Sequence, residues 1–184
     1  MVANTITLIR LPLTFGVIAL FGIHRYLDLT LIASIVFIFA LDAVDGIVAR
    51  KRNETSEVGA VLDTLADRVI ENTFWLYFAI VGLIPMWMPI AVMTRGIFTD
   101  CLQRFFGNPK SGWAHALTRS RISRALYGVI KTLAFICLAS AGVFKGIILE
   151  QGSLILATIA VGFCLLRGLP FFFTVQRTPH TQRT

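Results

Sequence analysis

Charged residues are scarce in this chain of 184 residues: Asp, Glu, Lys and Arg together make up 15% of it, whereas apolar residues make up 56%. Soluble globular domains carry about 25% charged residues. The mean hydropathy is +0.76. This composition excludes a disordered chain, a collagen-like fibre and an ordinary cytosolic enzyme. It indicates an integral membrane protein.

Cysteine is also scarce. Cys101, Cys137 and Cys164 lie far apart in the sequence and form no C-x-x-C pair or Cys/His cluster. The cysteines therefore indicate neither a disulfide framework nor a zinc site, and we interpret them as packing residues. The first apolar run lacks a preceding basic region and a clear A-x-A site. We therefore interpret it as a retained helix and not as a secretion signal.

Acidic residues are outnumbered: the 10 Asp and Glu stand against 17 Lys and Arg, which gives a net charge of +7. The basic residues are scattered between apolar segments and form no dense stripe, which argues against nucleic-acid binding. Six segments approach or exceed the roughly 20 apolar residues that a membrane-spanning helix needs. They predict one all-α integral membrane domain over residues 1–184, with transmembrane helices at 5–23, 29–50, 58–83, 86–106, 122–144 and 152–175.

The distribution of Lys and Arg predicts the orientation of these helices. The run Arg50, Lys51 and Arg52 and the basic segment 104–124 fall on one side of the membrane, together with both termini. The loops on the opposite side contribute only Arg25 and Lys145. Because cytoplasmic loops are enriched in Lys and Arg, we expect both termini and the two basic loops in the cytoplasm.

Four aspartates interrupt the apolar pattern near the cytoplasmic side. Asp42 and Asp45 lie near the cytoplasmic end of the second predicted helix, and Asp63 and Asp67 lie near the start of the third. An aspartate at the centre of a bilayer costs about 2.5–3.5 kcal/mol, so such residues usually serve a function. Their spacing puts each pair on one helical stripe, and a short loop makes the two helices antiparallel neighbours. Four converging carboxylates suit Mg²⁺ or Mn²⁺, and two such ions can clamp a diphosphate.

An alternative interpretation is structural. The aspartates could pair with Arg50, Arg52 and Arg68. The small residues Gly46, Ala49 and Gly59 leave room for a ligand on the same faces, but they also suit tight helix packing. Both uses can hold at once. The register of four aspartates with small residues between them favours the metal site.

The aspartates form the pattern D-x-x-D-G-x-x-A-R, followed after eight residues by G-x-x-x-D-x-x-x-D. This pattern resembles the signature of the CDP-alcohol phosphotransferases. The resemblance implies that the chain transfers a phosphatidyl-type group from a CDP-linked lipid to an alcohol and releases CMP. It also implies that Asp42 and Asp63 bridge two metal ions, that Asp45 and Asp67 complete the two sites, and that Asp67 is the general base. The eight matching residues are Asp42, Asp45, Gly46, Ala49, Arg50, Gly59, Asp63 and Asp67.

By the same resemblance, the CDP moiety lies against the first three helices. Gly46 would let the nucleotide approach the backbone, Arg50 would contact the diphosphate, and Ser56 would add a polar contact. The N-terminal run N-x-x-T-x-x-R also matches the family. Asn4 or Thr5 could instead cap the first helix. The residues expected to line the CDP site are Asn4, Thr5, Ile6, Thr7, Gly46, Arg50 and Ser56.

Basic residues inside the later helices point to the acceptor. Arg95 lies within the fourth helix, with Asp100 on a neighbouring turn, and Lys131 lies within the fifth. Cations in such places suit a phosphate-bearing acceptor, such as glycerol 3-phosphate or an inositol phosphate. Arg119 and Arg121, in the loop before the fifth helix, are better explained as topology signals that bind anionic headgroups.

The subgroup features are mixed. Gly128, Lys131 and Thr132 resemble the G-K-x-K-T run of glycerophosphate phosphatidyltransferases, although Val129 replaces its first lysine. The segment from Asp63 to Arg68 is similar to the inositol-phosphate enzymes instead. We expect glycerol 3-phosphate as the acceptor, as in the phosphatidylglycerolphosphate synthase-like subgroup, with inositol phosphate or another alcohol as the alternative.

Two other functions fit an aspartate-rich membrane protein less well. A membrane prenyltransferase usually needs more helices and lacks the D-G-x-x-A-R continuation. A divalent-cation transporter should carry acidic residues deeper in the membrane, whereas these aspartates cluster at one face. The resemblance to the CDP-alcohol phosphotransferase family also implies a homodimer.

Overall fold

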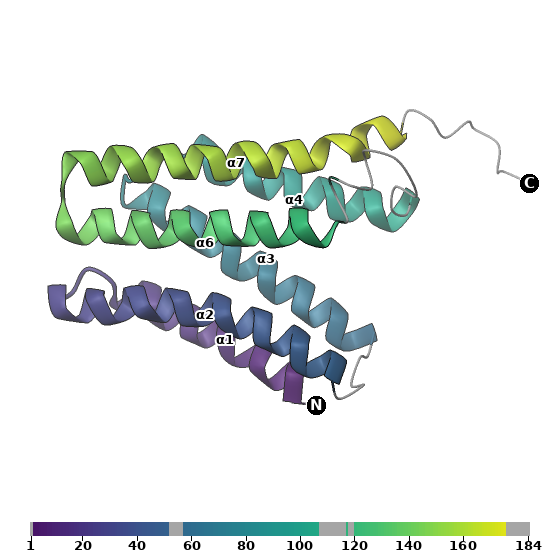
Figure 1. Cartoon of the computed structure of the whole chain (residues 1–184), viewed down its shortest axis with the longest axis horizontal. Helices are drawn as coiled ribbons and strands as arrows, with labels where there is room; N and C mark the ends of the chain where they lie inside the picture. The colour runs from purple at the N-terminus through teal and green to yellow at the C-terminus, as the bar shows by residue number, and fades with distance from the viewer. Residues whose placement is uncertain (1, 52–56, 107–116, 118–119, 176–184) are drawn as a thin grey trace, which may run out of the picture.

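The computed structural model describes residues 2–51, 57–106, 117 and 120–175, and it contains only helices among them. Figure 1 shows their arrangement. The six helices are α1 (Val2–Leu20), α2 (Arg25–Lys51), α3 (Glu57–Ile80), α4 (Trp87–Phe106), α6 (Arg121–Phe144) and α7 (Ile147–Val175).

Each of the predicted helical segments is confirmed as a helix, and five boundaries differ by three residues or more: both ends of α1, the start of α2, the end of α3 and the start of α7. Helix α7 begins at Ile147, well before the predicted residue 152, because the polar Glu150 and Gln151 lower the hydropathy of that turn without breaking the helix. Helix α1 begins at Val2. Asn4 and Thr5 therefore lie inside α1, and their interpretation as helix caps is wrong.

The turns at the end of the bundle farther from the aspartates are closed by backbone geometry. Gly82 ends α3 with φ +81°, a conformation that favours glycine. The Leu83 N–H donates to the carbonyl oxygen of Phe78 at 3.0 Å, and the Gly82 N–H donates to that of Ala79 at 3.1 Å. These two hydrogen bonds satisfy carbonyl groups in the last turn of α3. The chain is thus turned sharply toward α4.

The helices form two antiparallel pairs joined by α3. In Figure 1, α1 and α2 lie below, α6 and α7 lie above, and α3 crosses between the pairs. Helix α3 packs against α1, α4 and α6, and α4 also packs against α7. The end of α2 and the start of α3 lie at the right of the view, together with the start of α1 and the end of α7. We call this the aspartate end of the bundle, because Asp42, Asp45, Asp63 and Asp67 belong to it.

An aromatic core fixes α3 against α6 and α2. The Phe135 ring of α6 is 4.9 Å from the Trp75 ring, 5.5 Å from the Phe74 ring and 5.7 Å from the Phe39 ring, measured between centroids. Phe74, Trp75 and Phe135 are buried. Such ring pairs add to the stabilisation from burial itself. The helices are therefore fixed together in the middle of the bundle, directly below the polar residues described next.

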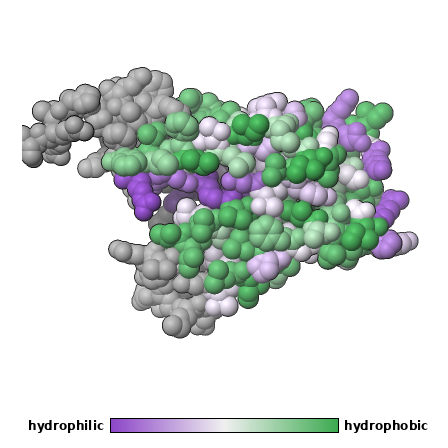
Figure 2. Space-filling model, turned by 180° about the vertical axis from the view of Figure 1, so that it is seen from behind, coloured by the Kyte–Doolittle hydropathy of each residue, from purple (hydrophilic) through white to green (hydrophobic). Residues whose placement is uncertain are grey.

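Within the described part of the chain, two helices can cross a membrane by their length and composition alone: residues Ile122–Phe144 and Ile147–Pro170, with mean hydropathies of 1.8 and 1.9. Large apolar side chains also face outward from the other helices, including Phe37 of α2 and Ile97 of α4. Figure 2 shows this apolar surface over much of one face. The structure therefore agrees with a membrane protein of all-α fold.

Candidate functional site

Hydrophilic side chains enter the bundle from the aspartate end. Figure 2 shows the molecule hollowed at this end, on the left of the view, with hydrophilic residues between two apolar parts. Burial of polar groups within an apolar bundle costs free energy, so such groups usually pair with each other or belong to a functional site. The hollow is therefore the candidate functional site.

The aspartates lie on helical backbone, as predicted. Asp63 and Asp67 are one turn apart in α3, and Asp42 and Asp45 lie within α2. The Asp67 carboxylate is 43% exposed, and its Oδ1 lies 3.2 Å from Nη2 of Arg10. The side chains of Asp42 and Asp45 lie outside the described residues, so their convergence on α3 stays a prediction.

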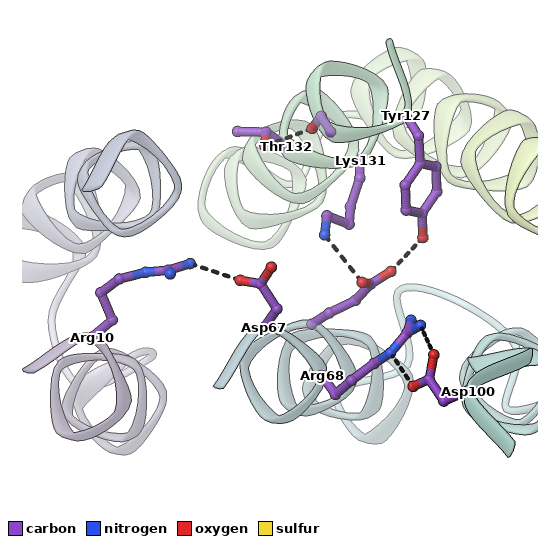
Figure 3. A network of polar contacts seen from close by, with 9 residues as sticks. Arg10, Asp67, Arg68, Asp100, Tyr127, Lys131 and Thr132 are labelled. Atoms are coloured by element: carbon purple, nitrogen blue, oxygen red, sulfur yellow. Dashed lines mark hydrogen bonds and ion pairs between the residues drawn. The ribbon is translucent and has the colours of Figure 1, made fainter. Parts of the chain in front are cut away.

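Arg10 holds this carboxylate from the inside of the bundle. Its side chain is 1% exposed. Its Nε–H donates to the carbonyl oxygen of Ile38 at 3.1 Å, and its Nη2 donates to Asp67 (Figure 3). One guanidinium therefore connects α1 to both α2 and α3. Sequence analysis placed Arg10 in the N-terminal motif but did not predict its partner.

The carboxylates present suit the predicted metal ions. Among the residues whose side chains are described, no group of three or more His, Cys, Asp and Glu converges on one point. Asp63 and Asp67 nevertheless provide carboxylate oxygens on one stripe of α3, and hard divalent cations prefer such ligands. Asp42 and Asp45 are the other predicted ligands. The chemistry of these donors fits Mg²⁺ or Mn²⁺.

The predicted CDP contacts are divided between described and undescribed residues. Thr7 is buried in α1, one turn before Arg10, while Thr5 is exposed and Ile6 half-buried. Gly46 and Arg50 lie within α2. Their side-chain surroundings lie outside the description, as do those of Asn4, and Ser56 lies outside the described residues altogether. These contacts stay predictions.

A buried carboxylate continues the aspartate stripe of α3. Glu71 follows Asp67 by four residues, as Asp67 follows Asp63, and it is 5% exposed. The Tyr127 hydroxyl donates to its Oε1, and Nζ of Lys131 donates to its Oε2 at 3.1 Å (Figure 3). Sequence analysis missed both Glu71 and Tyr127. The spacing of four residues along α3 was the pattern that could have revealed Glu71.

Lys131 is therefore an ion-paired residue within an apolar helix. Its Nζ also lies 5.4 Å from the centroids of the Phe39 and Tyr127 rings. Such cation–π contacts stabilise a partly desolvated ammonium group. The structure thus gives Lys131 an ion-pair partner, Glu71, within the bundle. An acceptor contact by this residue stays a proposal.

Arg68 pairs with α4 and not with the aspartate cluster. Its Nε and Nη2 donate to the two carboxylate oxygens of Asp100 at 2.9 and 2.8 Å. The alternative in which the aspartates pair with Arg50, Arg52 and Arg68 is therefore wrong for Arg68. The side chains of Arg50 and Arg52 lie outside the described residues, so their part stays a prediction. Gly96, one turn before Asp100, makes room, because a Cβ there would lie 3.3 Å from Nη1 of Arg68. Asp100 lies on the turn that follows Arg95 in α4, as expected, and its carboxylate pairs with Arg68.

Two arginines approach the same region from α4 and α7. A Cβ on Gly168 would lie 2.9 Å from Cγ of Arg95, so the Arg95 side chain crosses α7 at this glycine. The Arg95 Nε is buried and has no hydrogen-bond partner among the described residues. The Arg167 guanidinium lies 5.3 Å from the Tyr127 ring centroid, and Arg95 and Arg124 are within electrostatic range of it. Sequence analysis missed Arg167, although a charged residue within an apolar span was a visible pattern.

Comparison with known proteins gives a consistent set of relatives. The family model described as CDP-alcohol phosphatidyltransferase matches residues 1–166. A Mycobacterium tuberculosis (strain ATCC 25618 / H37Rv) protein named "Putative cardiolipin synthase" is 36% identical over 64 residues, which are 35% of this chain and 31% of that protein. The chain thus matches only about a third of the length of that relative.

Two further relatives are matched over longer segments. A Bacillus subtilis (strain 168) protein named "CDP-diacylglycerol--glycerol-3-phosphate 3-phosphatidyltransferase" is 29% identical over 148 residues, which are 77% of this chain and 72% of that protein. A Mycobacterium tuberculosis (strain ATCC 25618 / H37Rv) protein named "Probable phosphatidylglycerophosphate synthase" is 27% identical over 105 residues, which are 55% of this chain and 50% of that protein.

Proposed function

This chain belongs to the CDP-alcohol phosphatidyltransferase family, and from that premise we propose that it transfers a phosphatidyl group from CDP-diacylglycerol to a hydroxyl of glycerol 3-phosphate. CMP is the second product. The names of the Bacillus subtilis and Mycobacterium tuberculosis relatives support this acceptor. The observation that carries it in the structure is the group of basic side chains Arg95, Arg167 and Lys131 inside otherwise apolar helices.

The reacting groups meet at Asp67. Its carboxylate takes the proton of the acceptor hydroxyl, and the oxygen forms a bond to the phosphorus that carries the diacylglycerol. The bond from that phosphorus to the bridging oxygen breaks, and CMP leaves. A half-exposed carboxylate held by a buried arginine suits this role, because the base must be both accessible and oriented. Arg10 supplies the orientation.

Metal ions belong to this proposal. When bound, two Mg²⁺ or Mn²⁺ ions would neutralise the diphosphate of the donor and stabilise the leaving CMP. Asp42, Asp45, Asp63 and Asp67 are the residues that would hold them. Asn4, Thr5, Ile6, Thr7, Gly46, Arg50 and Ser56 would line the CDP site beside them.

The phosphate of the acceptor would bind deeper in the hollow. The buried Nε of Arg95 has no hydrogen-bond partner among the described residues and suits an anionic oxygen. Arg167 and Arg124 add positive charge nearby. Arginine is well matched to phosphate because its fork of N–H groups can donate two bonds. We propose that Arg95 contacts the phosphate and that Lys131 adds a second contact.

A second acceptor follows from the cardiolipin synthase name of one relative. In that case the hydroxyl would belong to phosphatidylglycerol. This acceptor bears one phosphodiester charge and two acyl chains, so it makes less use of a buried group of arginines. An inositol phosphate is the third candidate, because Thr64 and Arg68 stand where that subgroup has similar residues.

The test is to incubate the purified full chain with CDP-diacylglycerol and Mg²⁺, and to offer glycerol 3-phosphate, inositol phosphate or phosphatidylglycerol in separate reactions. Mass spectrometry then identifies the lipid product. We expect phosphatidylglycerol phosphate from the first reaction only. A lipid product from another acceptor would change the assigned acceptor. If none of the three acceptors leads to CMP release, the proposal is contradicted.

The setting of the reaction completes the proposal. We propose a multi-pass membrane protein of six spans, with the aspartate end and both termini in the cytoplasm, where water-soluble acceptors are available. We also propose a homodimer, in line with the family resemblance. The family match argues against a prenyltransferase or a cation transporter. Metal flux without CMP release would favour the transporter.

A further inference from the structure

Glu71 is a buried carboxylate that the proposed reaction does not use. It is 5% exposed, at the boundary between α3 and α6. A buried charge is strongly destabilising unless it is paired and hydrogen-bonded. Here both carboxylate oxygens are bonded, one to Tyr127 and the other to Lys131. The pairing explains how Glu71 is tolerated and leaves open what it does.

The position of Glu71 relates it to the acceptor site. It lies one turn deeper in the bundle than Asp67 on the same stripe of α3, a rise of about 6 Å at 1.5 Å per residue. The hydroxyl and the phosphate of a three-carbon phosphate alcohol are separated by a distance of the same order. An acceptor with its hydroxyl at Asp67 therefore has its phosphate at the depth of Glu71 and of the basic residues around it.

The contacts of Glu71 extend to two of these basic residues. Glu71 bonds Lys131 directly, and this fixes a long side chain that would otherwise reach toward water. Its bond to the Tyr127 hydroxyl fixes the end of that ring. The Arg167 guanidinium lies over the same ring, 5.3 Å from its centroid, and Phe163 stacks on the ring at 6.3 Å. One carboxylate thus sets the place of Lys131 and, through Tyr127, of Arg167.

A rigid support lies beneath this network. Lys131 is followed one turn later in α6 by Phe135, and Glu71 is followed in α3 by Phe74 and Trp75. These three aromatic residues are buried in the core. Binding sites are effective when their contact residues are held in place before the ligand arrives, because less ordering is needed on binding. The network has this property.

We propose that Glu71 is a positioning residue for the acceptor: together with Tyr127 it holds Lys131 and Arg167 in the arrangement that binds the acceptor phosphate. Glu71 itself does not contact the acceptor. This inference rests on the proposed transfer to a phosphate-bearing alcohol. It adds a specificity function to residues that carry no metal and take no proton.

The test compares Michaelis constants for the two substrates in the purified full chain. In Glu71→Gln the carboxamide keeps the size of the side chain but loses the ion pair with Lys131. We expect the KM for glycerol 3-phosphate to rise about tenfold or more, while the KM for CDP-diacylglycerol stays within about twofold of the wild type. Tenfold corresponds to about 1.4 kcal/mol of binding. Tyr127→Phe should raise the same KM by a smaller factor.

Asp100→Asn is the matched control. It also removes the charge from a carboxylate that pairs with a basic residue across two helices, here Arg68. If cross-helix ion pairs only stabilise the fold, both variants lower the unfolding temperature and neither changes one KM selectively. We expect Asp100→Asn to leave the KM for glycerol 3-phosphate close to the wild-type value.

The outcomes separate this inference from the proposed function. An active wild type with equal changes of both KM values in Glu71→Gln, or with no change, contradicts the positioning role alone. If Glu71→Gln does not fold, Tyr127→Phe decides by the same comparison, because it preserves the ion pair between Glu71 and Lys131. A folded wild type that releases no CMP with any acceptor contradicts the proposed function itself.

Discussion

Arg10 is the residue on which the orientation of the proposed base depends. It is a long, charged side chain inside an apolar helix, and its burial is tolerated because it donates to both Ile38 and Asp67. An arginine can do this because its N–H groups point in fixed and different directions. A lysine has a single nitrogen on a flexible chain. The carboxylate of the proposed base, Asp67, is therefore held by an arginine 57 residues away in the sequence.

Arg10→Lys tests this dependence. The lysine retains the positive charge but cannot reach both oxygens in the same geometry. We expect kcat to fall about tenfold, an increase of about 1.4 kcal/mol in the activation free energy, with a smaller change in the KM for CDP-diacylglycerol. Steady-state kinetics on the purified protein give both values.

Arg104→Lys is the control for that substitution, since Arg104 lies at the exposed end of α4. It should leave kcat unchanged. An Arg10→Lys variant with wild-type kcat would mean that Asp67 is oriented by something other than Arg10.

Residues of the site differ in how visible they are in the sequence. The four aspartates stand out because charge is rare in this chain and because they repeat at helical spacing. Glu71 follows the same spacing of four residues, so the sequence could have predicted it as a member of this stripe. The partner of Arg10 was not, because spacing within one helix says nothing about which side chain of another helix lies opposite. Contacts such as that between Arg167 and Tyr127 require the packed helices.

At the scale of helices, α7 approaches α4 closely at a glycine. The Arg95 side chain occupies the space that a side chain on Gly168 would need. Gly162 lies on the same helix, and a Cβ there would meet nothing within 4 Å. Substitutions at the two glycines can therefore be compared to measure how the close approach of α7 to Arg95 affects acceptor binding and stability.

We expect Gly168→Ala and Gly162→Ala to have different effects on acceptor binding and on stability. In Gly168→Ala the new Cβ would lie 2.9 Å from Cγ of Arg95, so Arg95 must move and the KM for glycerol 3-phosphate should rise severalfold. In Gly162→Ala nothing must move, and the better helix propensity of alanine should stabilise the protein by about 0.5–1 kcal/mol or leave it unchanged. Unfolding temperature and acceptor KM are the two measurements. If both variants have the same KM for glycerol 3-phosphate, the position of the Arg95 side chain does not affect acceptor binding.

Helices were easier to predict than their contacts. Apolar runs separated by polar loops marked all the described helices, because a spanning helix must be apolar over most of its length. The start of α7 was placed late, since hydropathy falls at Glu150 although the backbone stays helical. The pairing of Arg68 with Asp100 joins positions 32 apart, and that of Glu71 with Lys131 joins positions 60 apart. No periodicity links such positions, so only packing could reveal them.

At the scale of the whole molecule, the hollow is open at a single end of the bundle in the view of Figure 2. The helix segments that carry the aspartates and the first turns of α1 lie at that end. In the proposed reaction, a water-soluble acceptor would enter and CMP would leave from this side. The excess of Lys and Arg predicts that this side is the cytoplasm.

Cysteine accessibility tests the orientation. In a variant without the three native cysteines, we introduce Asn53→Cys or Lys145→Cys and label intact bacterial cells with a maleimide that does not cross membranes. We expect the reagent to label position 145 in intact cells, and to label position 53 only after the cells are broken. Labelling of position 53 from outside would contradict the topology.

The most direct test of the central claim is CMP release by the purified wild-type protein with CDP-diacylglycerol, Mg²⁺ and glycerol 3-phosphate, measured beside Asp67→Asn. We predict release that requires glycerol 3-phosphate in the wild type, and a rate lower by a factor of about 10²–10⁴ in Asp67→Asn, as for loss of a general base. Equal release by both proteins, or release that is independent of any acceptor, would contradict the account.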